Sequence, residues 1–248
     1  WDRGYGDFRI SGDRIFYPAW QPASALLIGN ILDGEGREVF QSPRAVLSRQ
    51  CEKAHSMGLQ AMAASELEFY LFDNEYGDVA ASGGSGLRFS SPYPVDYHIF
   101  STDSAEPLIG EIRRKIDESG IPVESSKGET GLGQYEIALR YAGALESADR
   151  HIVYKWGAKS IAASQGKSVT FMAKYSDRDA GSSCHVHMSL ASVGAAGAAG
   201  AASGAAETGA GGVGGKNAFL SSGAGGREES DLFRHFLGGL IALSSELF

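Results

Sequence analysis

The sequence predicts an α+β fold, in which a mostly antiparallel sheet lines a site and helices cover the outer face of that sheet. Two observations indicate this class. Strand-like and helix-like patterns alternate along the 248-residue chain, and the strand-like runs are short. Several of these runs also carry acidic or imidazole side chains at alternate positions, which places such groups on one face while apolar residues cover the other.

Short apolar or alternating runs predict the strands, and turn residues separate them. The apolar run 23–32 is followed by the turn residues 33–36 and then by 39–40, which predicts a hairpin. The strands expected along the chain are 23–32, 39–40, 67–72, 121–124, 134–140, 168–173 and 185–190. Gly, Ser, Asp and Tyr prevail in 73–94 and turn residues in 175–183, so both stretches are expected to be loops.

Helices are predicted where apolar residues recur at helical spacing between a cap and a breaker. Ser42 is suited to cap the first helix, Pro43 fits its first turn, and Gly58 follows its end. Gly120 and Gly166 end the next two helices in the same way. The expected helices are 42–57, 104–119, 144–165 and 228–248.

The composition is that of a globular protein and argues against several classes of partner. Hydrophobic residues make up 43% of the chain, and 30 acidic against 22 basic residues give a net charge of −8. No basic stretch could neutralise a run of phosphates, so we expect no nucleic-acid partner. No apolar run is long enough to span a bilayer and Trp1 begins no signal-peptide pattern, so we expect no membrane partner. We interpret Cys51 and Cys184 as free thiols of a cytoplasmic protein, with a disulfide between them as the alternative.

The last third of the chain contains a segment of very low complexity. Residues 191–226 are almost pure Ala, Gly and Ser, which cannot bury enough apolar surface to offset the entropy of ordering. This segment is therefore expected to be a disordered excursion. The helix pattern that follows stops at Phe248 without a cap, so the chain is expected to be a fragment of a longer protein.

Three stretches offer acidic or imidazole ligands in strand-like settings. Alternate side chains of a strand lie on the same face, so Glu66 and Glu68 point the same way, as do His185 and His187. The third stretch, 129–136, has a glutamate at each end. If these groups converge, their negative charge requires a cation. Oxygen-rich ligation with a single nitrogen favours Mg²⁺ or Mn²⁺ over structural zinc.

Each stretch alone also has a simpler interpretation. Glu66 and Glu68 could lie on a solvated strand face, although the apolar residues around them favour a covered strand. The run 129–136 could be a glycine-rich surface turn with solvated glutamates. His185 and His187 could be core side chains or half of a zinc site.

Together, the order of these pieces resembles the glutamine synthetase family. Separated motifs match in the right order, and the resemblance runs from about Gly4 to the end of the chain, apart from the Ala- and Gly-rich segment. The matching residues are 42–47, 66–72, 129–136, 148–155, 170–174 and 181–190.

The resemblance implies both a domain organisation and an activity. It implies a partial glutamine synthetase-like catalytic domain over 41–248, preceded over 1–40 by the end of a small β-grasp-like N-terminal domain. It also implies an ATP-dependent ligase that joins glutamate to ammonia through γ-glutamyl phosphate, with Mg²⁺ or Mn²⁺ bound and ATP as a substrate. Family members form stacked rings with sites between subunits, so a homo-oligomer is implied as well.

The same resemblance assigns roles to residues of this chain. It makes Glu68, Glu129 and Glu136 the ligands of a first metal ion, and Glu129 is the candidate catalytic residue. It makes Glu66 and His185 ligands of a second ion that bridges the nucleotide phosphates. The implied nucleotide contacts are Glu124, Tyr141, His187 and Ser189. The implied substrate contacts are Ala180 and Gly181.

The chain departs from the family pattern beside the first ligand of the run 129–136. Ser126, Lys127 and Gly128 stand where ammonia-using members usually have histidines, and Ser183 replaces a usual glycine. The last ligand of the second ion and the arginines that grip glutamate and phosphate would lie beyond the chain's end. Three hypotheses follow: glutamine formation from ammonia, γ-glutamyl ligation to a polyamine or other organic amine, and a non-catalytic relative or fragment that binds nucleotide and metal.

Overall fold

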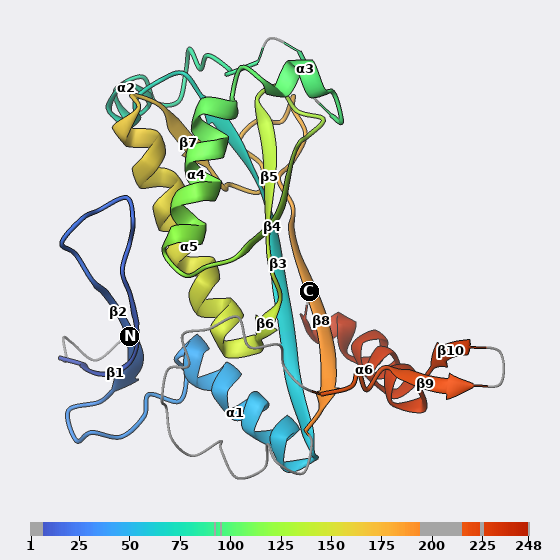
Figure 1. The fold of residues 1–248 in the computed structure, drawn as a ribbon. Helices are drawn as coiled ribbons and strands as arrows, with labels where there is room; N and C mark the ends of the chain where they lie inside the picture. Colours follow the sequence, from blue (N-terminus) through green and yellow to red (C-terminus); the bar gives the residue numbers. More distant parts are fainter. Residues whose placement is uncertain (1–6, 92, 95, 194–214, 224–225, 248) are drawn as a thin grey trace.

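The computed structural model describes residues 7–91, 93–94, 96–193, 215–223 and 226–247 (Figure 1). The helices of this part are α1 (Pro43–Ser56), α2 (Tyr76–Ala81), α3 (Ile99–Thr102), α4 (Glu106–Glu118), α5 (Ala144–Ser164) and α6 (Asp231–Leu247). The strands are β1 (Arg9–Phe16), β2 (Leu26–Leu32), β3 (Leu59–Phe72), β4 (Val123–Gly128), β5 (Gln134–Leu139), β6 (Ala142–Gly143), β7 (Ser168–Thr170), β8 (Cys184–Ser192), β9 (Leu220–Gly223) and β10 (Gly226–Glu229). Among the described residues, no helix is long and apolar enough to cross a membrane.

The main sheet is built around the 14-residue strand β3. Its strand order is β4-β5-β3-β6, and β7 and β8 also pair with β3. One edge of β3 pairs with β8 and then β7, the other with β6 and then β5, and every pairing is antiparallel. Helices α4 and α5 cover one face of this sheet (Figure 1). The predicted α+β class with an antiparallel sheet is confirmed.

Alternation along β3 separates a core face from a polar face. Leu67, Phe69 and Leu71 are buried in the hydrophobic core, so Glu66 and Glu68 point to the opposite face. The core residues of the covering helices are Leu108, Ile109, Ile112, Ile116, Val153, Tyr154, Ala158, Ile161 and Ala162. Apolar burial, which contributes roughly 25 cal/mol per Å², holds the helices to this face and leaves the glutamates on the other.

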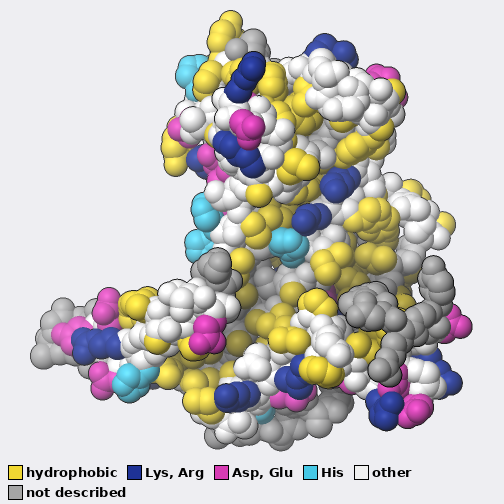
Figure 2. All heavy atoms as spheres, turned by 180° about the vertical axis from the view of Figure 1, so that it is seen from behind, with side chains coloured by type: hydrophobic (Ala, Val, Ile, Leu, Met, Phe, Trp, Pro, Cys, Tyr) yellow, Lys and Arg dark blue, Asp and Glu magenta, His cyan; other side chains and the backbone are white. Residues whose placement is uncertain are grey.

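The strand β8 is largely exposed. The side chains of His185 and His187 are 54% and 64% exposed, and Val186 and Met188 between and after them are exposed as well. Figure 2, turned to the side opposite Figure 1, shows histidine and hydrophobic side chains lying together on the middle part of the surface. The sheet therefore presents imidazole groups to solvent where no helix covers it.

The N-terminal hairpin differs from the prediction. β2 pairs antiparallel with β1, for which no pattern indicated a strand. The expected partner 39–40 contributes only a hydrogen bond of 3.0 Å from Val39 N to Ile31 O, beside a bridge between Leu32 and Glu38. β1 is exposed along nearly its whole length, so its sequence lacks the alternation that indicates a buried face.

Other boundaries also differ, while α1, α4 and α5 lie where the patterns predict them. β3 begins at Leu59 rather than at residue 67, because its first half pairs with β8. The expected loop 73–94 contains α2, and β7 ends at Thr170 although its apolar run continues to Ala173.

The C-terminal part extends away from the main sheet (Figure 1). Most of the expected excursion 191–226 lies outside the described residues, and at its two ends β8 continues to Ser192 and β9 pairs with β10. α6 begins only after β10, so it is shorter than the expected helix 228–248. Phe219 is buried, and its ring centroid lies 5.3 Å from that of Phe233 on α6.

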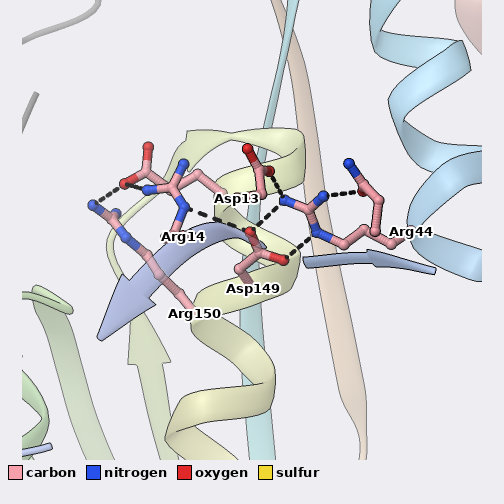
Figure 3. Close-up of polar contacts among 7 residues, drawn as sticks. Asp13, Arg14, Arg44, Asp149 and Arg150 are labelled. Atoms are coloured by element: carbon pink, nitrogen blue, oxygen red, sulfur yellow. Dashed lines mark hydrogen bonds and ion pairs between the residues drawn. The ribbon is translucent and has the colours of Figure 1, made fainter. Parts of the chain in front are cut away.

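A partly buried ion-pair network joins the hairpin to the main sheet's helices (Figure 3). At its centre is Asp149 of α5, whose side chain is 2% exposed and accepts hydrogen bonds of 3.0 Å from Nε and Nη2 of Arg44 on α1. Arg44 also contacts Asp13 of β1 and Asn30 of β2, and Arg14 Nε of β1 lies 3.5 Å from Asp149. Because a buried carboxylate requires such partners, this network holds the hairpin against α1 and α5.

Candidate metal centre

Three strands and one turn bring the predicted metal ligands together. Glu66 and Glu68 lie on β3, between β5 and β8. The register places Glu66 opposite His185 of β8 and Glu68 opposite Glu136 of β5. Glu129 follows β4 directly and enters the turn that leads to β5. Because directly opposed residues share a face, the strand-borne ligands all point to the polar side of the sheet.

The ligand atoms form two clusters that share Glu136. The first comprises Glu66, Glu136 and His185, and the second comprises Glu68, Glu129 and Glu136. Within each cluster the ligand atoms lie within 4.8 Å of one another. The first cluster contains the ligands expected for the second metal ion, with Glu136 as an additional member. The second cluster contains the ligands expected for the first metal ion. Their roles as ligands stay predictions.

The crowding of carboxylates changes the protonation of Glu136. Burial, followed by the hydrogen bond with Glu66 and repulsion from Glu66 and Glu129, raises the pKa of Glu136 to about 7. The nearby charge of Lys127 opposes this increase. The carboxyl group therefore keeps its proton almost to neutral pH. The four glutamates of the two clusters carry more negative charge than the neighbouring cationic side chains balance. This excess fits a site for a divalent cation.

Glu66 and two histidines form an ion-pair group at one side of the first cluster. His185 Nδ1 lies 2.8 Å from Glu66 Oε1, and His187 Nε2 lies 3.3 Å from Glu66 Oε2. The hydrogen bond between Glu66 and His185 lowers the pKa of Glu66 and raises the pKa of His185. Since a metal-bound imidazole is neutral, a cation ligated here would take the place of the proton on His185.

An ammonium group already contacts the second cluster. Lys127 Nζ lies 2.8 Å from Glu129 Oε1 and 3.5 Å from Asp96 Oδ1. It also lies over the ring of Tyr97, 4.1 Å from the centroid, in a cation–π contact. Burial disfavours the charged form, but the hydrogen bonds with Glu129 and Tyr97 outweigh it and raise the pKa of Lys127. The corner formed by Glu129, Asp96 and Tyr97 therefore accommodates a primary ammonium.

Gln134 is a supporting residue to which the sequence analysis assigns no role. It is buried, and its Nε2 donates to Glu68 Oε2 at 3.1 Å and to Gly181 O at 2.9 Å. Its Oε1 accepts a hydrogen bond of 3.0 Å from Gly131 N. One amide thus orients a ligand candidate, the turn after β4 and the loop before β8. The available signal was a polar residue at the start of a fully buried strand, because such a side chain needs partners.

The loop before β8 carries the two predicted substrate contacts, Ala180 and Gly181. Ala180 O accepts a hydrogen bond of 2.8 Å from Tyr70 Oη, and Gly181 O accepts from the buried amide described above. Ser183 N donates to Glu68 Oε2 at 3.0 Å. The backbone of this loop therefore borders the second cluster, and its contact with substrate stays a prediction.

The predicted nucleotide contacts fall into two groups. His187 and Ser189 lie on one face of β8. Glu124 lies on the edge strand β4 with its carboxylate 3.2 Å from Arg140 Nε, and Tyr141 follows β5 with 63% of its surface exposed. In the described part of the chain, no hydrogen bond or ion pair links the two groups. Their joint role in binding a nucleotide stays a prediction.

The fold and the site together define a class of protein. It is an α+β domain whose antiparallel sheet carries two carboxylate-rich clusters that share one glutamate. Oxygen-rich ligation with one imidazole fits Mg²⁺ or Mn²⁺. Paired cation sites of this kind are typical of enzymes that transfer phosphoryl groups.

Comparison with known proteins identifies the family. Residues 40–248 match the family described as "Glutamine synthetase, catalytic domain". A gamma-glutamylethanolamide synthetase of Streptomyces coelicolor is 39% identical over 246 residues, which are 98% of this chain and 48% of the relative. A glutamate–isopropylamine ligase of a Pseudomonas species is 36% identical over 200 residues, which are 78% of this chain and 42% of the relative. The chain belongs to the glutamine synthetase family.

A solved structure supports the same assignment. "Apo GmaS without ligand" superposes with a TM-score of 0.73 at 27% sequence identity, over 92% of this chain and 48% of that chain. The chain therefore spans about half the length of the relatives that it matches.

Proposed function

We propose that the protein containing this chain is an ATP-dependent ligase that joins the γ-carboxyl group of glutamate to a small organic amine. The observation that carries the proposal is the pair of ligand clusters sharing Glu136, in a chain of the glutamine synthetase family. The names of the two relatives above concern ethanolamine and isopropylamine, which are both small organic amines. Ser126, Lys127 and Gly128, in place of the histidines usual in ammonia-using members, also favour an organic amine.

The two clusters would divide the work of activating glutamate. Divalent cations bound there would offset the repulsion between the carboxylate of glutamate and the phosphates of ATP. Glu66 and His185 would hold the nucleotide side, and Glu68 and Glu129 the glutamate side. Glu136 belongs to both clusters and would keep the two sides close together. Transfer of the γ-phosphoryl group turns the carboxylate into γ-glutamyl phosphate, from which phosphate leaves when the amine attacks.

The amine must lose a proton before or during its attack. Glu129 is the group that we assign to accept it, because its carboxylate already receives a primary ammonium from Lys127 at 2.8 Å. The loop at Ala180 and Gly181 would hold glutamate against the cluster, since its backbone is tied to the same amide as Glu68.

The test is phosphate release by the full-length protein with ATP, Mg²⁺, glutamate and one amine at a time. The panel comprises ammonium, ethanolamine, isopropylamine and putrescine. We expect kcat/KM for a small organic amine to exceed that for ammonium by about tenfold or more, which corresponds to ~1.4 kcal/mol. Mass spectrometry should detect the matching γ-glutamylamide. Glu68→Ala should abolish turnover, whereas Glu118→Gln on the exposed side of α4 should retain it.

The other outcomes separate the remaining hypotheses. Turnover with ammonium alone would establish glutamine formation, the second candidate function, for which the same clusters would serve. Nucleotide binding without phosphate release for any amine would indicate a non-catalytic member of the family.

A further inference from the structure

A cavity lies between the edge strand β4 and the helices α3 and α4. Its volume is about 240 Å³. Its lining includes aromatic and aliphatic side chains and four hydroxyl groups, from Tyr97, Ile99, Thr102, Ile109, Ser126 and Tyr135, together with the imidazole of His98. Lys127 and Gly128 form the part of the lining that leads along the chain to Glu129. Lys127 thus belongs to the lining of this cavity and, through its ammonium group 2.8 Å from Glu129 Oε1, also to the second cluster.

The carboxylates at this cavity already have fixed cationic partners. Lys127 Nζ lies 2.8 Å from Glu129 Oε1 and 3.5 Å from Asp96 Oδ1. Glu106 lines the cavity and is paired with Arg113, whose Nη1 lies 3.1 Å from Glu106 Oε2. The charged groups that border this space are thus Lys127, Arg113 and the carboxylate of Glu106, which Arg113 neutralises.

We propose that Lys127 is a specificity-determining residue, which makes the acceptor site select amines with a small uncharged substituent over polyamines. This inference rests on the proposed ligase activity and names its class of amine. The reacting nitrogen of the acceptor binds at Glu129, and the rest of the acceptor enters the cavity. An alkyl or hydroxyalkyl substituent there meets apolar side chains and the hydroxyl groups of Thr102 and Ser126.

A second ammonium group meets a different environment in the same cavity. It loses part of its hydration, finds carboxylates that are already paired, and is repelled by the fixed charge of Lys127. Without the charge of Lys127, Asp96 becomes available to pair with that distal ammonium. The charge at position 127 therefore sets the ratio between the two kinds of amine.

The test compares kcat/KM for ethanolamine and putrescine in the full-length protein and its variants. Lys127→Gln should raise the putrescine-to-ethanolamine ratio by about tenfold or more, because like charges no longer meet. Lys127→Arg keeps the charge and should leave the ratio within about twofold. Adding Asp96→Asn to Lys127→Gln should cancel the gain.

Lys115 offers a matched control for the loss of a lysine charge. Its side chain on α4 is 28% exposed, like that of Lys127, and it pairs with Glu118 at 2.9 Å. Lys115→Gln should leave both kcat/KM values unchanged. Thermal unfolding checks that each variant folds, and Lys127→Met serves as a second charge-free variant if Lys127→Gln does not.

Three results would overturn the inference, and each points to a different cause. An equal loss of kcat/KM for both amines, with stronger Mn²⁺ binding, would show that Lys127 only neutralises Glu129. An unchanged ratio in both charge-free variants would show that another group selects the amine. Both of these leave the ligase activity in place. No turnover of the unmodified protein with any amine would instead reject the proposed function, and this inference with it.

Discussion

Among single residues, Glu136 is the one that connects the two ligand clusters, and its surroundings change its protonation. It belongs to both ligand clusters, is 7% exposed, and has a pKa raised to about 7 by burial and by its carboxylate neighbours. Gln134, two residues before it on the same strand, has four hydrogen-bond partners for its side-chain amide. Both residues make buried polar contacts. Replacing either residue should therefore change the free energy of unfolding and the metal affinity in a predictable direction.

Metal binding should depend on pH through Glu136. A divalent cation must displace the proton that Glu136 holds below a pH of about 7, so Mn²⁺ affinity should fall by about tenfold per pH unit below that value. Calorimetric titration in two buffers with different ionisation enthalpies measures the affinity and the released proton. Glu136→Gln should weaken binding and reduce the pH dependence near neutrality to the part that comes from the proton on His185. Equal affinity from about pH 6 to about pH 8 in the unmodified protein would contradict the prediction.

The same group should make the metal-free protein less stable as the pH increases. The pKa of Glu136 rises on folding from 4.5 to about 7, so the folded state binds the extra proton between these values. The contribution of this group to stability is fully present below about pH 4.5 and is lost as the pH rises through about 7. Denaturant unfolding along this range, compared with Glu136→Gln, isolates the effect. Mg²⁺ should restore the stability that is lost near neutral pH.

Gln134→Met should weaken the site while keeping the shape of the side chain. It leaves Gly131 N and Gly181 O without their partner and frees Glu68 to move, so the free energy of unfolding should fall by about 1–3 kcal/mol. Mn²⁺ affinity should fall by about 10-fold to 100-fold, as for groups that orient metal ligands. Equilibrium unfolding and metal titration measure the two effects. Loss of stability with unchanged Mn²⁺ affinity would show that Gln134 supports the fold alone.

At the level of single elements, the turn between β4 and β5 decides where Glu129 lies. This turn approaches β3 closely, because a Cβ atom at Gly131 would lie 2.0 Å from Tyr70 Oη. Gly133 in the same turn has a φ of +68°, which a residue with a side chain adopts only under strain. The glycines therefore serve close packing of the turn, and the sequence pattern indicated them without showing what they approach.

Gly131→Ala should disturb this turn and the second cluster with it. The added methyl group displaces Tyr70, whose hydroxyl holds Ala180 O at 2.8 Å, and should lower the free energy of unfolding by about 1–3 kcal/mol. Mn²⁺ affinity should fall as well. Gly77→Ala on α2 is the matched control, since nothing lies within 4 Å of a Cβ atom there. If the two variants unfold at the same denaturant concentration, the close approach of Gly131 to Tyr70 does not contribute to the free energy of unfolding.

Across the whole molecule, the ion-pair network of Figure 3 connects segments that the sequence analysis assigns to different domains. The expected boundary lies between 1–40 and 41–248, and Arg44 with Asp149 joins β1 and β2 to α1 and α5 across it. The domain division stays a prediction, as does the homo-oligomer implied by resemblance. Size-exclusion chromatography with light scattering of the full-length protein measures the latter.

Asp149→Ala should loosen the hairpin from the rest of the molecule. It removes the carboxylate that Arg44 and Arg14 share but leaves Asp13 beside Arg44 and Glu146 beside Arg14, so the free energy of unfolding should fall by about 1–3 kcal/mol. Hydrogen exchange should become faster in β1 and β2 than in β5. Arg37→Ala removes an ion pair whose arginine is 71% exposed, and should cost at most about 1 kcal/mol. Uniformly faster exchange in all strands would show that the network stabilises the whole fold instead.

Local patterns were sufficient for three helices and for naming the ligand candidates. Helical spacing with caps predicts α1, α4 and α5, and alternation on β3 and β8 places Glu66 with Glu68 and His185 with His187. These features depend on the periods of helix and strand, which are properties of neighbouring residues. For the same reason β1 was missed, because an exposed strand carries little alternation.

The contacts that make a site out of these residues depend on segments far apart in the chain. The hydrogen bond between Glu66 and His185 spans 119 positions, that between Gln134 and Glu68 spans 66, and that between Arg44 and Asp149 spans 105. Strand register and helix packing bring such partners together, and no local pattern encodes them. The amino-acid order therefore sufficed for the fold class and for the helices α1, α4 and α5, and it named the acidic and imidazole groups that the structure brings together. The sharing of Glu136, the support by Gln134 and the position of Lys127 at Glu129 arise from the packed three-dimensional structure.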